Sequence, residues 1–431
     1  MTLTPEPTPG DTSWFVHDRF GLFIHWGTYA LAARHEWVKS REQISTEAYM
    51  KYFEHFDPDL YDPEQWAAAA SDAGMKYFVI TTKHHEGFCL WDTELTDYKA
   101  ANTPYGKDLL KPMVDAFRAR DMKIGFYHSL LDWHHPHYTA DRCHPMRGNE
   151  EYLEQDKKRD LTKYAEYLHG QTEELLTQFG KVHIIWFDFS IKATDQSPGK
   201  GKDVWQSEKL IELVRKHQPN ILINDRLEID QDLKTPEQFM PRGWVMVDGK
   251  PVVWEACHTF SGSWGYYRDE ETWKSVDQLV KMLIECVSKG GNLLLNVGPT
   301  GRGEFDQRAL DRLSGMGEWM KRHGRSIYGC TQAPEEYPCP EDCRYTYNPD
   351  TKRLYLHVFS WPFKHIHLDG MADKVEYAQL LNDASELKML RHAPQAEYGS
   401  MSEKHASDLL TFEIPVKKPN VTVPVIELFL K

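Results

Sequence analysis

Short apolar runs alternate with longer amphipathic segments through roughly the first 330 residues of this 431-residue chain. Seven of these runs are predicted strands, at residues 20–25, 77–82, 124–128, 183–189, 221–225, 252–255 and 292–297. Helical spacing lies between them, at residues 63–73, 109–120, 151–179, 204–217 and 276–288. Several strands are nearly continuous in apolar residues, which is typical of parallel strands covered on both faces.

This alternation predicts an α/β fold, a (β/α)8-like barrel. No eighth unit is evident, so we expect an irregular barrel. The alternative is a doubly wound open sheet, but no glycine-rich phosphate loop follows the first strand to favour it. In either a closed barrel or an open sheet, the carboxyl ends of the parallel strands should lie at the same end of the sheet.

The sequence pattern changes after Tyr328. Residues 331–431 contain a group of prolines and then shorter alternating runs at 353–359, 388–390 and 422–430, separated by turn signals such as Asn348-Pro349-Asp350. This pattern predicts a small antiparallel β-sandwich. We therefore expect two domains, a catalytic barrel over residues 1–330 and a C-terminal β-sandwich over residues 331–431.

Charge and composition exclude some classes of partner. The 51 Lys and Arg residues against 65 Asp and Glu residues give a net charge of −14, which argues against wide contact with nucleic acid. No uninterrupted apolar run of about 18 residues occurs, so we expect no membrane span. The polar, proline-rich start lacks the pattern of a secretory signal, and seven scattered cysteines are typical of free thiols. These features predict a cytoplasmic protein, unless a leader has already been removed.

Polar and aromatic side chains follow the predicted strands. Active sites of parallel barrels lie at the carboxyl ends of the strands. The residues found there are His25-Trp26-Gly27, Lys83-His84-His85-Glu86-Gly87, Tyr127-His128-Ser129, Trp186-Phe187-Asp188, Asn224-Asp225-Arg226, Trp254-Glu255 and Asn296. The convergence of such side chains on one end of a barrel indicates a site for a sugar-like ligand.

Asp188 stands out among these residues because it lies inside the apolar run Ile184–Phe189. A charge in such a run is costly unless it is hydrogen-bonded or used in chemistry. Two interpretations stay open from the residues alone. Asp188 is either a buried structural carboxylate that pairs with an arginine or caps a loop, or a nucleophile at the end of its strand.

Histidines and cysteines offer little support for a metal site. His84 and His85 are adjacent, and neighbouring residues of a strand point to opposite faces. The group at residues 134–137 lies in a polar loop, the first strand has no His-x-His pair, and Cys339 with Cys343 supplies only half of a structural zinc site. We therefore expect no metal and no cofactor, and a metal-dependent barrel hydrolase remains the less favoured alternative.

An ordered set of motifs resembles the α-L-fucosidases of glycoside hydrolase family 29. The resemblance runs from about residue 14 to residue 330, and the C-terminal segment matches the β-sandwich of those enzymes without a motif of its own. The motifs that carry it are Phe20-Gly21-Leu22-Phe23-Ile24-His25-Trp26-Gly27, Lys83-His84-His85-Glu86-Gly87-Phe88, Trp186-Phe187-Asp188, Asn224-Asp225-Arg226, Ser263-Trp264-Gly265-Tyr266 and Gly290-Gly291-Asn292-Leu293-Leu294-Leu295-Asn296-Val297-Gly298-Pro299.

The resemblance implies a retaining exo-α-L-fucosidase that removes terminal fucose from fucosylated oligosaccharides or glycoconjugates through a covalent fucosyl–enzyme intermediate. Such chemistry needs two carboxyl groups about 5–5.5 Å apart. The family's nucleophile matches Asp188. For the acid/base we favour Glu237, in a loop after the fifth strand, over Glu255, which follows Trp254.

The resemblance also implies a set of residues that bind the sugar. Trp264 matches an aromatic side chain that packs on the C6 methyl group of fucose. The set comprises His25, Glu36, His84, His85, Tyr127 or His128, Trp186, Arg226, Glu255 and Trp264. A non-catalytic carbohydrate-binding barrel is the other alternative, although it would not need two carboxyl groups. The linkage preference, the aglycone and the oligomeric state stay open.

Overall fold

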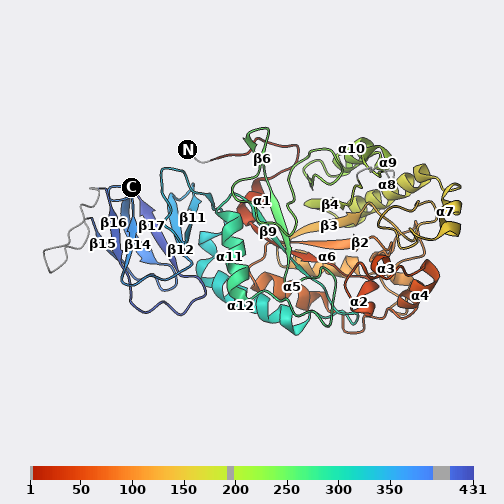
Figure 1. Cartoon of the computed structure of the whole chain (residues 1–431), viewed down its shortest axis with the longest axis horizontal. Coiled ribbons are helices and arrows are strands. Elements are labelled where there is room, and N and C mark those ends of the chain that lie inside the picture. Colours follow the sequence, from red (N-terminus) through yellow and green to blue (C-terminus); the bar gives the residue numbers. More distant parts are fainter. Residues whose placement is uncertain (1–2, 192–198, 392–407) are drawn as a thin grey trace.

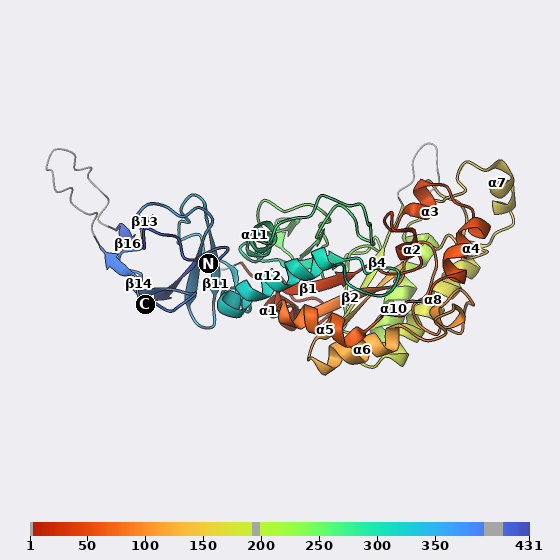
Figure 2. The ribbon, with the colours of Figure 1, turned by 90° about the horizontal axis from the view of Figure 1, so that it is seen from below.

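The computed structural model describes residues 3–191, 199–391 and 408–431. The molecule is elongated, with a parallel sheet and its surrounding helices at one end and antiparallel sheets built from the C-terminal segment at the other (Figure 1). The same division is visible after a quarter turn (Figure 2). No helix in the described ranges is both long and apolar enough to cross a membrane.

Seven parallel strands form the main sheet, in the order β5-β4-β3-β2-β1-β9-β8. Nearly all of their residues are buried, as the continuous apolar runs predicted, because helices cover the outer face and side chains fill the interior. The strands are β1 Phe20–Ile24, β2 Tyr77–Lys83, β3 Lys123–Ser129, β4 Ile184–Asp188, β5 Leu222–Ile223, β8 Glu255–Thr259 and β9 Asn292–Val297.

Residues 232–238 lie between the two edge strands, β5 and β8. Isolated parallel bridges join Asn224 to Leu233, Lys234 to Trp254, and Glu237 to Cys257. This segment stands where an eighth strand would close the barrel, but it is too irregular to be a continuous strand. Its sequence, Asp-Leu-Lys-Thr-Pro-Glu-Gln, has no apolar run and contains Pro236, which has no N–H to donate. The expected irregular barrel is confirmed, and the irregularity lies here.

The strand predicted at residues 252–255 is displaced in the structure. The strand itself, β8, begins at Glu255, and the apolar residues before it follow a two-stranded hairpin of β6 Met246–Val247 and β7 Lys250–Pro251. The buried strand Glu-Ala-Cys-His-Thr contains polar side chains. The prediction, which relied on apolar runs, therefore selected the apolar residues just before it. Glu255 therefore lies at the amino end of its strand and not at the carboxyl end.

Helices pack around the sheet, and several of them begin at a side chain that caps their first N–H groups. Asp62 accepts from the N–H groups of Glu64 and Gln65, and Ser275 forms a reciprocal capping box with Gln278. The helix predicted at 151–179 is two helices, because Asp160 caps a new start. The helices are α1 Ser13–Asp18, α2 Tyr29–Ala32, α3 Val38–Arg41, α4 Thr46–Glu54, α5 Pro63–Asp72, α6 Leu110–Ala119, α7 Glu150–Asp156, α8 Leu161–Gln178, α9 Lys202–Trp205, α10 Ser207–His217, α11 Val276–Val287 and α12 Gln307–His323, with short 3-10 turns at Ala100–Asn102 and Gly324–Ser326.

The described part of the C-terminal segment forms two antiparallel sheets, which confirms the predicted β-sandwich. One has the order β10-β11-β12-β17-β14 and the other β13-β16-β15. This segment contacts the barrel through apolar side chains, because Tyr355 and Val425 belong to the barrel's core cluster. It also makes a polar contact, because the Trp319 indole N–H of α12 donates to the Val423 carbonyl at 2.9 Å. The strands are β10 Thr331–Gln332, β11 Cys343–Asn348, β12 Arg353–Val358, β13 His365–Leu368, β14 Val375–Leu380, β15 Lys388–Leu390, β16 Leu410–Glu413 and β17 Val425–Leu430.

Candidate active site

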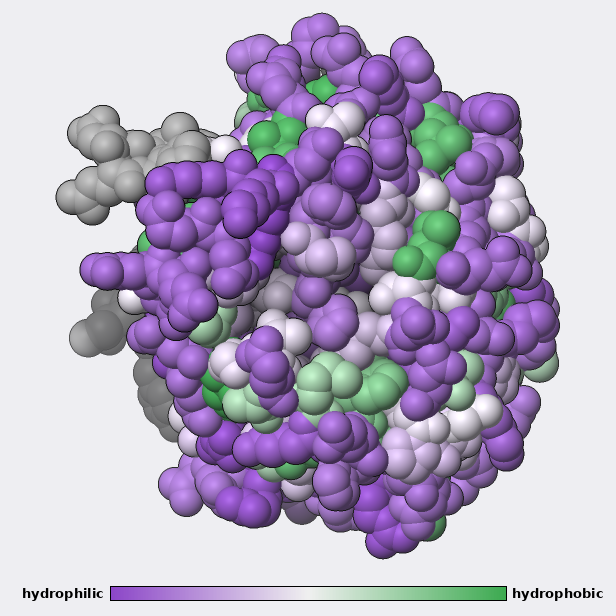
Figure 3. Space-filling model, turned by 90° about the vertical axis from the view of Figure 1, so that its right-hand side faces the viewer, coloured by the Kyte–Doolittle hydropathy of each residue, from purple (hydrophilic) through white to green (hydrophobic). Residues whose placement is uncertain are grey.

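A cavity opens at the carboxyl ends of the parallel strands. The face around it is built from the loops and short helices that follow the strands; this face is largely hydrophilic and is hollowed near its centre (Figure 3). The cavity is lined by Phe23, His25, Trp37, His84, His85, Tyr127, Trp186, Asp188, Phe189, Glu237, Cys257 and Trp264. Eight of these twelve side chains belong to the set predicted from the sequence.

Asp188 ends β4 at the wall of this cavity, and its side chain is 15% exposed. The Tyr127 hydroxyl donates to one carboxylate oxygen at 2.8 Å, and an Arg226 nitrogen donates to the other at 2.9 Å. Both donors stabilise a negative charge on Asp188. Burial, followed by the negative charge of Asp188, raises the pKa of Tyr127 well above its usual value, so the phenol stays a donor.

Arg226 joins Asp188 to Glu237. A second nitrogen of the same guanidinium donates to Glu237 at 3.0 Å, and the rest of the group is fixed by the hydroxyl and carbonyl of Thr235, at 2.9 and 3.0 Å. Partial burial and then the charge of Asp188 raise the pKa of Glu237 above its ordinary value, although Arg226 opposes the shift. The two carboxyl groups therefore differ: one has two donors for its charge, and the other is biased toward keeping a proton.

Glu255 lies beneath the cavity and not at its wall. Its carboxyl group accepts from the indole N–H of Trp186 at 3.1 Å and from the Tyr77 hydroxyl. Complete burial raises the pKa of Glu255 to about 8. The strand prediction that put Glu255 at the carboxyl end was wrong, for the reason given above. In the structure Glu255 supports the floor of the site through Trp186.

Three histidines lie along one side of the cavity, and each has its Nδ1 atom turned toward another residue. His25 Nδ1 lies 2.6 Å from Asn296 Oδ1, His85 Nδ1 lies 2.7 Å from Ser129 Oγ, and His84 Nδ1 lies 3.7 Å from a Glu86 carboxylate oxygen. Burial lowers the pKa values of His25 and His85 well below the usual range. Both rings are therefore neutral.

Besides Glu255 and Arg226, two more of the predicted substrate contacts do not line the cavity. Of the two candidates on the third strand, Tyr127 lines the cavity, whereas His128 points to the opposite face of β3, where its Nδ1 lies 3.1 Å from Thr82 Oγ1 and its ring packs on Trp91. The assignment of His128 to the substrate is corrected, because adjacent strand residues face opposite ways. Glu36 is buried behind the cavity wall and accepts from the Gly265 N–H at 2.7 Å.

Four lining residues were not predicted: Phe23, Trp37, Phe189 and Cys257. Phe189 has φ +82°, an uncommon left-handed conformation for a bulky residue, and its ring packs on Trp37 and His85. In the sequence, the only indication that Phe189 and Trp37 belong to the site was that each follows a predicted site residue, Asp188 and Glu36. An aromatic residue beside a polar one does not by itself show which of the two faces the cavity.

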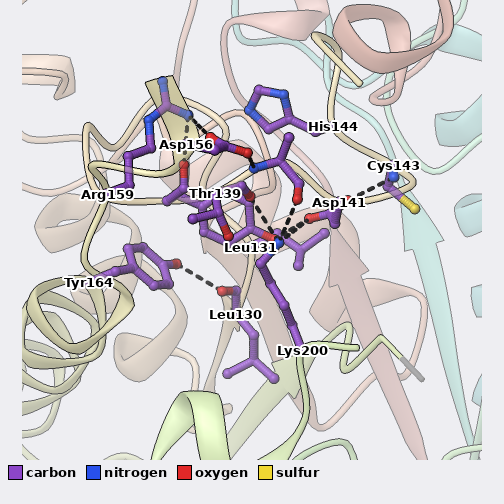
Figure 4. Close-up of polar contacts among 12 residues, drawn as sticks. Leu130, Leu131, Thr139, Asp141, Cys143, His144, Asp156, Arg159, Tyr164 and Lys200 are labelled. Atoms are coloured by element: carbon purple, nitrogen blue, oxygen red, sulfur yellow. Dashed lines mark hydrogen bonds and ion pairs between the residues drawn. The ribbon is translucent and has the colours of Figure 1, made fainter. Parts of the chain in front are cut away.

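Outside the cavity, a buried lysine fixes the segments that follow β3 and β4. The Lys200 ammonium donates to the carbonyls of Thr139 and Ala140 at 2.8 and 3.2 Å and lies 3.4 Å from an Asp141 carboxylate oxygen (Figure 4). Lys200 also pairs through its backbone with Ile191, just after β4. This cluster therefore joins the segment after β4 to the loop after β3.

Within the described ranges, no group of three or more His, Cys, Asp or Glu side chains is arranged to hold a metal ion. The cavity instead presents two carboxyl groups on one arginine, neutral imidazoles and several aromatic rings. Paired carboxyl groups of unlike protonation are the machinery of glycoside hydrolysis.

Comparison with known proteins agrees with this chemistry. The model of the α-L-fucosidase family matches residues 6–325. The chain belongs to the α-L-fucosidase family. Human plasma alpha-L-fucosidase is 28% identical over 424 residues, covering 91% of this chain and 84% of the relative. The structure of alpha-L-fucosidase isoenzyme 1 from Paenibacillus thiaminolyticus is 44% identical, has a TM-score of 0.89 and covers 97% of this chain and 98% of its own.

A third relative is informative about mechanism. It is an α-L-fucosidase from Bacteroides thetaiotaomicron, solved as a trapped covalent intermediate with 2-fluoro-fucosyl fluoride; it is 26% identical, with a TM-score of 0.83 and coverage of 100% of this chain and 98% of the other. Family membership confirms the fucosidase activity and the barrel with a C-terminal sandwich that the ordered motifs predicted.

Proposed function

We propose that this chain removes terminal α-L-fucose with retention of anomeric configuration, with Asp188 as the nucleophile and Glu237 as the acid/base. The observation that carries the assignment is the single Arg226 guanidinium that contacts both carboxyl groups at the cavity wall. One cation within 3.0 Å of both holds the two acidic groups next to each other at the cavity wall. The trapped intermediate of the Bacteroides relative supports a covalent route.

In the first step an Asp188 oxygen forms a bond to the anomeric carbon while the glycosidic C–O bond breaks. The leaving oxygen takes the proton of Glu237. In the second step water loses a proton to Glu237 and forms a bond to the anomeric carbon, which releases Asp188 as a carboxylate. Two inversions at one carbon give net retention. Trp186 forms the floor of the cavity and is held from beneath by Glu255.

The assignment of Asp188 is tested by replacing it with glycine. We expect turnover to fall by several orders of magnitude, because the covalent route is lost, while circular dichroism stays unchanged. Added azide should restore part of the activity and give the β-fucosyl azide. A variant that unfolds, or that azide does not rescue, would favour the purely structural interpretation of Asp188.

Glu237 and Glu255 are distinguished by the leaving group. A general acid matters most when the leaving alcohol is weakly acidic. Glu237→Ala should nearly abolish hydrolysis of fucosylated oligosaccharides while an activated aryl fucoside still reacts. Glu255→Ala should depress both substrates alike, since Glu255 acts on the floor. If the two variants exchange these behaviours, Glu255 is the acid/base.

The proposal also concerns which fucosyl linkages the enzyme hydrolyses. Two activities fit the family, a broad α-L-fucosidase and an enzyme restricted to α1,3/4-linked fucose in branched oligosaccharides. A panel of fucosylated oligosaccharides tested beside an aryl α-L-fucoside separates them. Hydrolysis of both kinds of substrate identifies the broad enzyme, and hydrolysis of the branched oligosaccharides alone identifies the restricted one.

We also propose a cytoplasmic location. All seven cysteines lie in described residues and are free thiols, and burial raises the pKa of several, such as Cys89 to about 12. Free thiols persist in a reducing compartment. Fractionation of the source cells, with activity measured in each fraction, tests this location.

A further inference from the structure

Each of the three cavity histidines turns Nδ1 toward a polar group of the protein. His25 and His85 do so through a hydrogen bond, whereas His84 lies 3.7 Å from the Glu86 carboxylate, beyond hydrogen-bond distance. Among the contacts of the described residues, no protein partner is recorded for Nε2 of His25, His84 or His85. The tautomer of a histidine is set by what its other nitrogen contacts. The partners of Nδ1 therefore decide what Nε2 offers to a ligand.

For His25 the partner is an amide of fixed orientation. The Asn296 Nδ2 group donates to the Trp264 carbonyl at 2.6 Å, and a carbonyl can only accept. The Asn296 Oδ1 atom therefore faces His25, and it too can only accept. The hydrogen in the 2.6 Å contact belongs to His25 Nδ1, which leaves the lone pair on Nε2.

For His85 the partner is a hydroxyl whose hydrogen is already used. Ser129 Oγ donates to the Leu131 carbonyl at 2.8 Å and accepts from the Leu131 N–H at 3.0 Å. Only a lone pair remains for the 2.7 Å contact with His85 Nδ1. His85 therefore donates from Nδ1, and its Nε2 also carries the lone pair.

For His84 the neighbour of Nδ1 is the Glu86 carboxylate, at 3.7 Å, and both side chains are almost completely buried. A carboxylate offers no hydrogen and attracts one. The electrostatics thus favour a hydrogen on Nδ1 of His84 as well.

We propose that His25, His84 and His85 are held as Nδ1–H tautomers, so that three Nε2 lone pairs accept hydroxyl hydrogens of the bound fucosyl unit. Asn296, Glu86 and Ser129 are then positioning residues that act through these rings. A fucoside carries three free ring hydroxyls, and each can donate one hydrogen. The inference rests on the proposed function, because it takes this cavity to be the place where the sugar binds.

The first experiment measures which sugars bind. Free L-fucose, its monodeoxy analogues and the corresponding monofluoro analogues are compared as competitive inhibitors of the wild-type enzyme. At each hydroxyl that the site reads, removing the group should weaken inhibition about tenfold or more, since a buried acceptor is left unpaired. Fluorine has lone pairs but no hydrogen, so the fluoro analogue should inhibit no better than the deoxy analogue.

The outcomes separate the inference from the proposed function. If a fluoro analogue inhibits several-fold better than its deoxy counterpart at those positions, the rings donate from Nε2 and the inference is wrong. If L-fucose and all its analogues inhibit equally, or not at all, the cavity is not the sugar site and the proposed function fails first.

The second experiment tests a positioning residue. Ser129→Ala frees His85 to take either tautomer, so inhibition by L-fucose should weaken about threefold to tenfold. At one ring position the fluoro analogue should then inhibit more strongly, relative to the deoxy analogue, than it does with the wild type. Thr82→Val is the matched control, because it removes the equivalent hydroxyl from His128, which faces away from the cavity. Equal changes in the ratio for both variants would show a general structural effect and overturn the role of Ser129.

A measurement on the wild type does not depend on whether Ser129→Ala folds. Proton–nitrogen correlation spectra of ¹⁵N-histidine-labelled enzyme distinguish a protonated Nδ1 from a protonated Nε2, and single His25→Gln, His84→Gln and His85→Gln variants assign the signals. Three Nδ1–H tautomers support the inference, and an Nε2–H form at His25, His84 or His85 overturns it.

Discussion

Arg226 gives its two carboxyl partners different environments. Asp188 accepts from both Arg226 and the Tyr127 hydroxyl, whereas Glu237 has the single contact with Arg226 and a partly exposed side chain. The pKa of Glu237 rises because partial burial and the charge of Asp188 outweigh the arginine. Because the two carboxyl groups lie in different environments, we assign Asp188 as the charged group and Glu237 as the acid.

The pH dependence of activity follows from this difference. An acid works only while protonated, so kcat/KM should fall as the pH rises through the raised pKa of Glu237. The profile of the wild type on an aryl fucoside should therefore have an alkaline limb, and Glu237→Gln should lack it. Initial rates across the pH range check this expectation. An unchanged alkaline limb in Glu237→Gln would show that another group is the acid.

At the scale of elements, the base of β8 is tied to β2 and β4 through Glu255. Its carboxyl group keeps a proton up to about pH 8 in the folded chain, against an ordinary pKa of 4.5. Between these values the folded chain binds a proton that the unfolded chain has lost, so stability is full below pH 4.5 and falls as the pH rises toward 8.

Glu255→Gln should remove this dependence, because an amide does not titrate. The free energy of unfolding of the wild type, relative to that of Glu255→Gln, should fall by about 4 kcal/mol between pH 4.5 and pH 8. Urea unfolding of both proteins at several pH values measures the difference. Parallel curves would contradict the buried neutral carboxyl.

The loop after β3 depends on Lys200. Lys200→Met leaves two carbonyls and the Asp141 carboxylate without their cation, so we expect a loss of about 2–4 kcal/mol in the free energy of unfolding. Lys157→Met is the matched control, because Lys157 pairs with Glu154 at the exposed surface of α7. That change should have almost no effect on stability. Equal losses in the two variants would show that the Lys200 cluster has no special role.

Continuous apolar strands were predictable from the sequence, as β1, β2 and β9 show, because they are buried on both faces. The position of β8 was not predictable, because its polar side chains find their hydrogen-bond partners on residues distant in sequence. The closing segment 232–238 has no strand pattern at all. Asp188 was identifiable as a charge in an apolar run, whereas the place of Glu237 on that closing segment depends on its bridge to Cys257.

At the scale of the molecule, the C-terminal sheets share a core with the barrel. Tyr355, Val423 and Val425 pack into the same apolar cluster as α12, and the Arg344 guanidinium pairs with Glu285 of α11 at 2.8 Å. We therefore expect the full chain to unfold in one cooperative transition. Differential scanning calorimetry that resolves two separate transitions would contradict this coupling.

The central claim is that Asp188 forms the covalent bond to fucose. The most direct measurement is peptide mass spectrometry after reaction with 2-fluoro-fucosyl fluoride, the reagent named with the Bacteroides relative. The fluorine at C2 slows both steps, but the anomeric fluoride is a good leaving group and speeds the first step alone, so the intermediate should accumulate. We expect one fluorofucosyl group on the peptide that contains Asp188, and none on the Asp188→Ala variant. A label on Glu237 or Glu255, or a label that survives in Asp188→Ala, would contradict the account.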